Sequence, residues 1–174
     1  MPLVIAMAGL PGSGKSALAR ELERRLGALR WDKDELRELL FPAARVAHDR
    51  ALNDFCMELA YSGIGQAAKR VPVLILDGRP FTERAQRERA REAARAAGVP
   101  LVFVLCTAPM QVLRARITQG AHVAPDRDVS LLERVSARTD PFEGDEIRVD
   151  TSEGSVHDAA AHCIAELRSR AHLG

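Results

Sequence analysis

Residues 9–16, Gly-Leu-Pro-Gly-Ser-Gly-Lys-Ser, match the phosphate-binding loop pattern G-x-x-x-x-G-K-S/T at every defined position. Glycines let the chain wrap its amide groups around a phosphate, because they adopt the required backbone angles without steric cost. In such a loop the Lys15 amino group reaches the β- and γ-phosphates, and the Ser16 hydroxyl binds Mg²⁺. The sequence therefore predicts a site for a nucleoside triphosphate and Mg²⁺. Its nucleotide-binding residues would be Gly12, Ser13, Gly14, Lys15, Ser16 and Ala17.

The chain on either side of this loop has the composition that the loop requires. An apolar run precedes it at Leu3–Ala8, and a helical pattern follows it at Lys15–Leu26. A helix that starts at the loop presents free N–H groups and its positive dipole end to an anion. An accidental match is expected in roughly one chain in a hundred or fewer of this length. The flanking elements make an accident rarer still.

A second group of polar residues, 31–37, reads Trp-Asp-Lys-Asp-Glu-Leu-Arg and follows a short strand predicted at 28–31. Ligands of open α/β sheets bind beyond the carboxyl ends of the strands. Asp34 and Arg37 are three residues apart at a helix start, so they share one face of its first turn. The carboxylate could accept a proton from an attacking hydroxyl, and the arginine could orient the acceptor. Spacing alone equally allows a helix cap and a surface arginine, and Asp32 is a rival carboxylate.

A third group is the apolar strand Val73–Asp77, which ends in an acid. In P-loop proteins the acid at the end of such a strand holds Mg²⁺. An acid at a strand end is often only a turn former, so the assignment of Asp77 depends on the phosphate-binding loop in the same chain. Together, Ser16 and Asp77 form the predicted metal site.

The elements that must position these groups alternate between short apolar runs and longer helical patterns, which predicts βαβ units around a parallel sheet. Strands are expected at 3–8, 28–31, 73–77, 101–106 and 147–150. Helices are expected at 15–26, 34–40, 47–69, 83–97, 109–118, 131–137 and 156–171. Thr82 is the expected N-cap of the fourth helix. That helix interleaves its arginines with glutamates at pairing distances, which predicts a solvated face.

Length and composition limit the classes of protein to consider. The chain has 174 residues, 47% of them hydrophobic, which predicts one domain spanning 1–174 with a full core. A net charge of +1 and 4% aromatic residues disfavour nucleic acid and anionic membranes as partners. The three cysteines have no metal-binding spacing. Without a signal peptide or a membrane-spanning stretch, we expect a cytoplasmic protein.

The three groups of residues together resemble the P-loop small kinases of the AAA_33 type. That family includes polynucleotide kinase, chloramphenicol phosphotransferase and zeta toxin kinases. The resemblance continues through Thr107-Ala108-Pro109, an arginine-bearing lid and a final Val149-Asp150-Thr151-Ser152, so it covers nearly the whole chain. It implies an α/β P-loop NTPase of the nucleoside- and nucleotide-kinase-like type. Such a fold has three layers, a five-stranded parallel sheet and a short mobile lid, here about 119–129.

The resemblance also implies roles for individual residues. Asp34 would be the general base, Arg37 an acceptor contact, and Lys15 the third catalytic group. Arg114 and Arg116 would be lid arginines that clamp the transferring phosphate, and Thr151 would lie near the adenine. A helix cannot place both arginines on one face, so we expect Arg116 to point into the site.

The chain departs from its relatives in the lid. Many relatives carry a second lid arginine about one helical turn beyond the first, where this chain has Gln119 and Gly120. Arg127 could substitute for it. The acceptor cleft is expected between 34–40 and the helix from 47. Its candidate lining residues are Trp31, Arg37, Phe41, His48, Asp49 and Arg79.

The resemblance implies an ATP-dependent, Mg²⁺-dependent kinase. It would transfer the γ-phosphoryl group to a hydroxyl of a small polar metabolite, nucleoside, sugar or antibiotic. ATP rather than GTP is what the resemblance implies, and the chain shows no Asn/Thr-Lys-x-Asp motif of guanine sites. Two alternatives stay open: a 5′-hydroxyl polynucleotide kinase, and an ATPase or switch with no acceptor. A monomer is expected for this size.

Overall fold

A computed structural model of the protein describes residues 1–42, 50–119 and 129–173. Five parallel strands form one sheet in the order β2-β3-β1-β4-β5. The strands are β1 (Leu3–Ala8), β2 (Leu29–Asp32), β3 (Val73–Asp77), β4 (Leu101–Thr107) and β5 (Ile147–Asp150). The predicted five-stranded parallel sheet is therefore confirmed.

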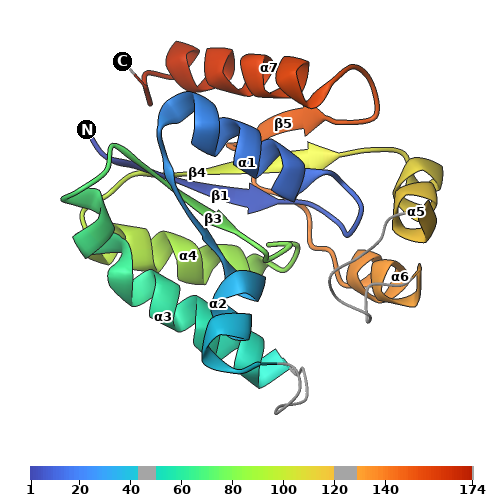
Figure 1. Ribbon diagram of the computed structural model, residues 1–174, viewed down its shortest axis with the longest axis horizontal. Helices are drawn as coiled ribbons and strands as arrows, with labels where there is room; N and C mark the ends of the chain where they lie inside the picture. The colour runs from blue at the N-terminus through green and yellow to red at the C-terminus, as the bar shows by residue number, and fades with distance from the viewer. Residues whose placement is uncertain (43–49, 120–128, 174) are drawn as a thin grey trace.

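Helices cover both faces of this sheet and make the three layers of the fold (Figure 1). On one face α1 and α7 pack against the sheet, and on the other face α3 and α4 do so. The helices are α1 (Lys15–Leu26), α2 (Lys33–Leu40), α3 (Arg50–Ala68), α4 (Arg84–Ala96), α5 (Met110–Gln119), α6 (Val129–Ala137) and α7 (Val156–Ser169). The short helices α5 and α6 pack on each other beyond the carboxyl end of β4.

The continuous apolar runs of the central strands follow from this layering. Every residue of β1 and of β3 is buried, because helices cover both sides of each strand. Alternate residues of β1 therefore enter two different cores: Ile5 packs with α1 and α7, and Ala6 packs with α3 and α4. The outer strand β5 has only two buried residues, Ile147 and Val149.

Strand order brings the predicted polar groups together at the carboxyl edge of the sheet. β3 lies between β1, which leads into the phosphate-binding loop, and β2. Asp32 at the end of β2 pairs in register with Asp77 at the end of β3. Two stretches 45 residues apart in sequence thus end side by side next to the loop.

Most predicted helices and strands begin or end within one or two residues of the observed ones, and two differences concern the site and its surroundings. β2 runs one residue further than expected, to Asp32, and α2 begins at Lys33 because the Asp32 carboxylate accepts a hydrogen bond from the Asp34 amide at 2.8 Å. The prediction of Thr82 as the N-cap of α4 is wrong. The N-cap is Glu83, which makes no side-chain cap bond, and the Thr82 carbonyl accepts hydrogen bonds from elsewhere.

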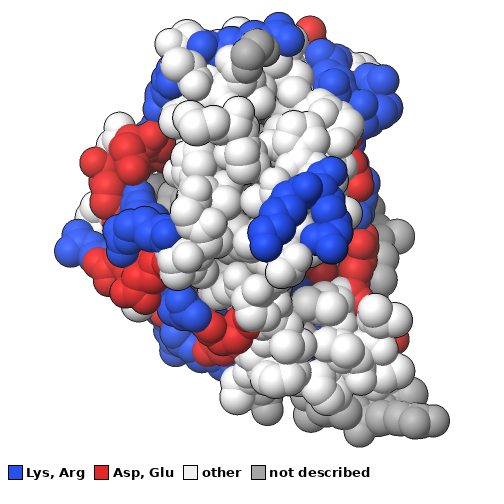
Figure 2. Space-filling model, turned by 90° about the vertical axis from the view of Figure 1, so that its left-hand side faces the viewer, with Lys and Arg blue, Asp and Glu red and all other residues white. Residues whose placement is uncertain are grey.

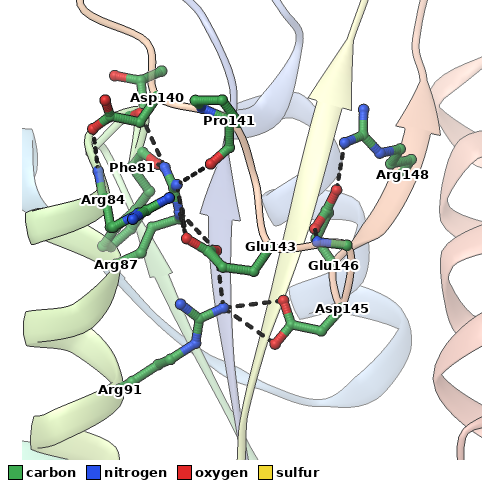
Figure 3. A network of polar contacts seen from close by, with 12 residues as sticks. Phe81, Arg84, Arg87, Arg91, Asp140, Pro141, Glu143, Asp145, Glu146 and Arg148 are labelled. Carbon is green, nitrogen blue, oxygen red and sulfur yellow. Dashed lines mark hydrogen bonds and ion pairs between the residues drawn. The ribbon is translucent and has the colours of Figure 1, made fainter.

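A strap of residues 139–146 connects α6 to β5 and is fastened to α4 by a polar network (Figure 3). Arg87 of α4 is fully buried at its centre and donates to the carbonyl groups of Phe81, Thr82 and Pro141 and to the Glu143 carboxylate. The predicted solvated face of α4 is therefore wrong at this arginine. None of the described helices combines the length and apolar composition that a membrane crossing requires.

Candidate active site

The phosphate-binding loop connects β1 to α1 and relies on its glycines. Gly12 and Gly14 have φ angles of +80° and +78°, a region that other residues rarely adopt. A Cβ atom at Gly12 would lie 2.8 Å from the Leu113 carbonyl oxygen of α5, so the loop is also tightly packed from outside. The loop ends at Lys15, the first residue of α1, and the N-terminal amides of that helix complete an anion site.

Ser16 and Asp77, the predicted metal pair, are in contact. The Ser16 hydroxyl donates to Oδ1 of Asp77 at 3.2 Å, although the two residues are 61 apart in sequence. The other oxygen, Oδ2, is buried without a hydrogen-bond partner, and the Arg30 guanidinium lies 3.6 Å from it. A hydroxyl and an unsatisfied carboxylate oxygen beside a phosphate loop fit Mg²⁺.

The described residues contain no group of three or more His, Cys, Asp or Glu that could hold a metal by itself. That finding is compatible with Mg²⁺, which proteins commonly bind through one or two side chains together with substrate phosphates. Ser16 and Asp77 would supply the protein side of such a site.

Burial raises the pKa of Asp77 above its usual value of 3.8, and the neighbouring Asp32 carboxylate raises it further. A charged Asp77 therefore costs folding free energy in the metal-free protein. Because the folded protein holds this proton more tightly than the unfolded chain, the cost appears as the pH rises above about 4.

We expect Asp77→Asn to stabilise the metal-free protein by about 1–3 kcal/mol at neutral pH, because it removes an incompletely partnered buried charge. The same change should weaken Mg²⁺-dependent nucleotide binding. Urea unfolding of both proteins between pH 4 and 8 would measure the difference, which should grow with pH. A difference that is constant with pH would show that the Asp77 charge is not its source.

Arg116 and Thr151, expected near the nucleotide, are joined to each other and to the phosphate-binding loop. The Arg116 guanidinium donates to the Thr151 hydroxyl at 2.9 Å and to the Thr151 carbonyl. The Thr151 hydroxyl in turn donates to the Ser13 carbonyl at 2.8 Å. These contacts place Arg116 beside the loop. Arg114 points elsewhere, into an exposed ion pair with Glu133 at 2.9 Å, so its predicted nucleotide contact is not supported.

Asp34 and Arg37 lie on one face of α2, as predicted from their spacing. Oδ1 of Asp34 is 2.9 Å from Nη1 of Arg37 and 2.9 Å from the Lys33 amino group. Asn53 of α3 accepts hydrogen bonds from both cations, at 2.7 and 3.1 Å. The Asp34 carboxylate is thus oriented by two cations that α3 holds in place.

Asp32, the other candidate for the general base, uses both carboxylate oxygens in hydrogen bonds within the protein. Its Oδ1 caps α2, and its Oδ2 accepts a hydrogen bond from Arg30 at 3.0 Å. Asp32 is buried, whereas the Asp34 side chain is 23% exposed and lines a cleft. Of the two acids, Asp34 is therefore the one that a second substrate can reach.

The cleft runs from the phosphate-binding loop to α4 and α6 and has a volume of about 440 Å³. Both the loop lysine and the acid of α2 line it. Its described walls come from five stretches of the chain, 11–15, 33–37, 50–54, 78–86 and 131–138. The lining residues that matter most below are Lys15, Asp34, Arg37, Arg79, Gln86 and Arg138.

Other predicted lining residues are placed differently. Trp31 packs against the core on the α3 side of the sheet, next to Gly63 of that helix. Phe41 stacks edge-on against Phe55 of α3, with ring centroids 5.9 Å apart. His48, Asp49, Arg127 and most of the predicted lid 119–129 lie outside the described residues.

Sequence reasoning missed several residues that line the cleft. Lys33 contacts Asp34, and Asn53 accepts hydrogen bonds from Lys33 and Arg37. Three further lining residues, Gln86, Arg134 and Arg138, are more distant from α2 in the sequence. A sequence signal existed only for the last two. Both are arginines, and no acid stands three or four residues away from either of them in the sequence.

Comparison with known proteins agrees with this geometry. The family model AAA_33, described as an AAA domain, matches residues 4–142. A cytidylate kinase of Rhodococcus opacus is 29% identical, over 98% of this chain and 79% of its own length.

Two solved structures are similar to the fold. A gluconokinase from Sinorhizobium meliloti has a TM-score of 0.67 and 23% identity, with 98% of this chain and 94% of that chain covered. The Mycobacterium tuberculosis APS kinase in complex with AMPPNP and APS has a TM-score of 0.71 and 22% identity, with 96% and 98% covered. The family model spans most of the chain, and the similar folds are those of P-loop kinases. The protein therefore belongs to the AAA_33 family and has the P-loop kinase fold.

Proposed function

We propose that the protein is a kinase that transfers the γ-phosphoryl group of ATP, with Mg²⁺, to a hydroxyl group of a small molecule. One observation carries the proposal: a single cleft is lined by Lys15 of the phosphate-binding loop and by Asp34 of α2. A hydroxyl compound in that cleft would lie between a phosphate-binding lysine and a carboxylate able to take its proton.

Each residue of the site would have a separate role in phosphoryl transfer. Asp34 would accept the proton of the attacking hydroxyl, while Lys33 and Arg37 fix the orientation of its carboxylate. Lys15 and the loop amides would bear the charge that develops on the phosphate oxygens. Mg²⁺ bound at Ser16 and Asp77 would neutralise part of that charge.

Arg116 would stabilise the loop and the nucleotide end of the site. Its guanidinium ties the Gly12 carbonyl, at 3.4 Å, to Thr151. Holding the loop in its phosphate-binding shape before the nucleotide arrives lowers the cost of ordering it during the reaction.

A hydroxyl acceptor is favoured over a phosphate acceptor by the carboxylate itself. A hydroxyl nucleophile must lose a proton, so a positioned base accelerates its attack. A phosphate acceptor is already ionised at neutral pH and needs no base. Asp34, placed in the cleft and oriented by two cations, has a chemical role only in the first case.

The proposal is tested by coupling ADP formation to an indicator reaction, with ATP and Mg²⁺ in the presence and absence of a small-molecule cell extract. A kinase should form ADP rapidly only when the extract supplies its acceptor. Equal ADP formation with and without extract would contradict the proposal and favour an ATPase or a switch.

A further inference from the structure

The proposed acceptor cleft has an excess of positive charge. Among its described lining residues are seven cations and three acids, Asp34, Asp54 and Glu83. The whole chain has 25 basic and 24 acidic residues, so the excess is local. On another face of the molecule, uncharged residues cover most of the middle apart from one group of basic residues, and both signs lie side by side along its edges (Figure 2). The cations of the cleft are Lys15, Lys33, Arg37, Arg50, Arg79, Arg134 and Arg138.

Several of these cations have acidic partners within the protein. Lys33 and Arg37 contact Asp34. Arg79 pairs with Asp54, and Arg50 lies 2.7 Å from Glu83. Lys15 is required for the phosphates of the nucleotide. The two remaining cations of the described cleft are Arg134 and Arg138, at the end of α6.

Arg134 lies in the last turn of α6, Arg138 follows directly after the end of that helix, and both line the cleft. The Arg134 guanidinium donates to the Ser130 hydroxyl at 2.7 Å, which neutralises no charge. Within the described part of the chain, the Arg138 guanidinium has no hydrogen bond or ion pair with a side chain. Among the described residues, neither arginine forms an ion pair with the three acids that line the cleft, and an anion bound there would neutralise their charge.

Two buried polar atoms that line the same cleft lack partners. The Arg37 side chain is 9% exposed, and its Nε group has no hydrogen-bond acceptor. Oε1 of Gln86 on α4 is also buried without a donor. Both residues line the cleft, and a polar ligand there would offer partners for these two atoms. The guanidinium matches the paired oxygens of a carboxylate, sulfate or phosphate.

The strap holds the α6 wall of the cleft in position (Figure 3). The Asp140 amide donates to the Thr82 carbonyl at 2.9 Å, and the Asp140 carboxylate accepts from the Arg84 amide at 2.7 Å. Arg87 donates to the Pro141 carbonyl at 2.7 Å. The segment that follows Arg138 is thus fastened to the start of α4, where Gln86 lies.

We infer that the acceptor carries, besides its hydroxyl, a permanent anionic group that binds Arg134 and Arg138 on the wall opposite α2. This inference rests on the proposed kinase function and narrows it. The acceptor is a hydroxyl compound with a phosphate, sulfate or carboxylate group. Neutral sugars, neutral nucleosides and neutral antibiotics are then excluded as acceptors.

The inference is tested by separating a small-molecule cell extract on an anion-exchange resin before incubation with γ-labelled ATP and the protein. Label should enter an organic compound from the retained, anionic fraction. Label that enters a compound of the unretained fraction would overturn the inference but leave the kinase function intact. Label found only in inorganic phosphate with both fractions would overturn the kinase function and the inference with it.

Variants of α6 test the residues. With the purified acceptor, Arg134→Gln/Arg138→Gln should raise the KM for the acceptor about 10- to 100-fold, because two charge-assisted contacts are lost. The KM for ATP should stay within about twofold. The matched control is Arg20→Gln/Arg168→Gln, which removes two exposed arginines of α1 and α7 on the other side of the sheet. An unchanged acceptor KM in the α6 variant would overturn the assignment.

Simple anions identify the group that binds. Phosphate, sulfate and acetate should compete with the acceptor in the wild type and lose that effect in the α6 variant. Stronger competition by phosphate or sulfate points to a phosphorylated or sulfated acceptor, and stronger competition by acetate points to a carboxylic acid. Equal inhibition of wild type and α6 variant by every anion would place anion binding elsewhere and contradict the inference.

Discussion

The Asp34→Asn variant is expected to transfer phosphoryl groups about 10²–10⁴-fold more slowly than the wild type. This factor is the usual contribution of a positioned general base to the rate. Asparagine keeps the shape of the side chain but cannot take a proton at neutral pH. The affinity for Mg²⁺ and ATP should be retained, because Ser16, Asp77 and the loop amides are untouched. Steady-state rates with the acceptor, together with nucleotide binding by calorimetry, measure the two effects separately.

Glu35→Gln is the matched control for this experiment. Glu35 is the next acid along α2, but its side chain is 60% exposed and pairs with Arg30. Surface pairs of this kind contribute little to stability, so the control should keep nearly full activity. Similar rates for Asp34→Asn and wild type would remove Asp34 from the mechanism, and Asp32 would then have to be tested in the same way.

Replacing Arg87 with methionine should lower the free energy of unfolding by about 3–5 kcal/mol, the usual cost of removing one partner of a buried ionic network. Arg87 is fully buried, donates to three carbonyl groups and to Glu143, and lies 4.2 Å from the centroid of the Phe142 ring. Its loss would leave buried carbonyl groups without donors. Chemical denaturation of the variant and the wild type measures the difference.

Arg91→Met is a control on the same carboxylate. Arg91 also contacts Glu143, at 3.2 Å, and Asp145, at 3.0 Å, but its own side chain is 22% exposed and donates to no carbonyl group of the described residues. It should cost about 1 kcal/mol or less. Equal losses for the two variants would contradict the central position of Arg87 in the network.

The Arg87 effect should depend on pH in a definite direction. Hydrogen bonds from Arg87 lower the pKa of Glu143 from 4.5 to about 2. The ionised Glu143 therefore stabilises the folded protein above pH 4.5, and this contribution is lost as the pH falls towards 2. The stability difference between wild type and Arg87→Met should shrink over this interval.

The nucleotide half of the site could be predicted from sequence because its determinants are local. The loop needs glycines at fixed spacing, and the helix that follows must begin at Lys15. The contact between Ser16 and Asp77 could also be anticipated, since each ends or follows a strand of the same parallel sheet. Helical periodicity predicts different directions for Arg114 and Arg116, and the structure places Arg116 beside the loop and Arg114 in an exposed ion pair.

The rest of the site depends on packing between distant segments. Arg87 lies in a helix rich in arginine and glutamate, whose composition resembles a solvated surface. It is buried only because the strap 139–146 crosses it, 56 residues away from Glu143 in sequence. In the same way, Arg134 and Arg138 reach the cleft because α6 is held against the start of α4, a contact that no local pattern encodes.

The cap of α2 shows why Asp32 and Asp34 could not be separated by spacing. Both acids precede or begin the same helix, and either could cap it. The choice depends on Arg30, which draws Asp32 towards the interior, and on Asn53, which fixes the cations around Asp34. Those partners come from a neighbouring strand residue and from a different helix.

The most direct test of phosphoryl transfer to a hydroxyl is the chemical form of the label after reaction of γ-labelled ATP with the protein and a small-molecule extract. Label in an acid-stable phosphate ester, present with wild type and strongly reduced with Asp34→Asn, is the expected result. Label in an acid-labile anhydride would identify a phosphate as the acceptor. Label in inorganic phosphate alone, equal for both proteins, would contradict the kinase function itself.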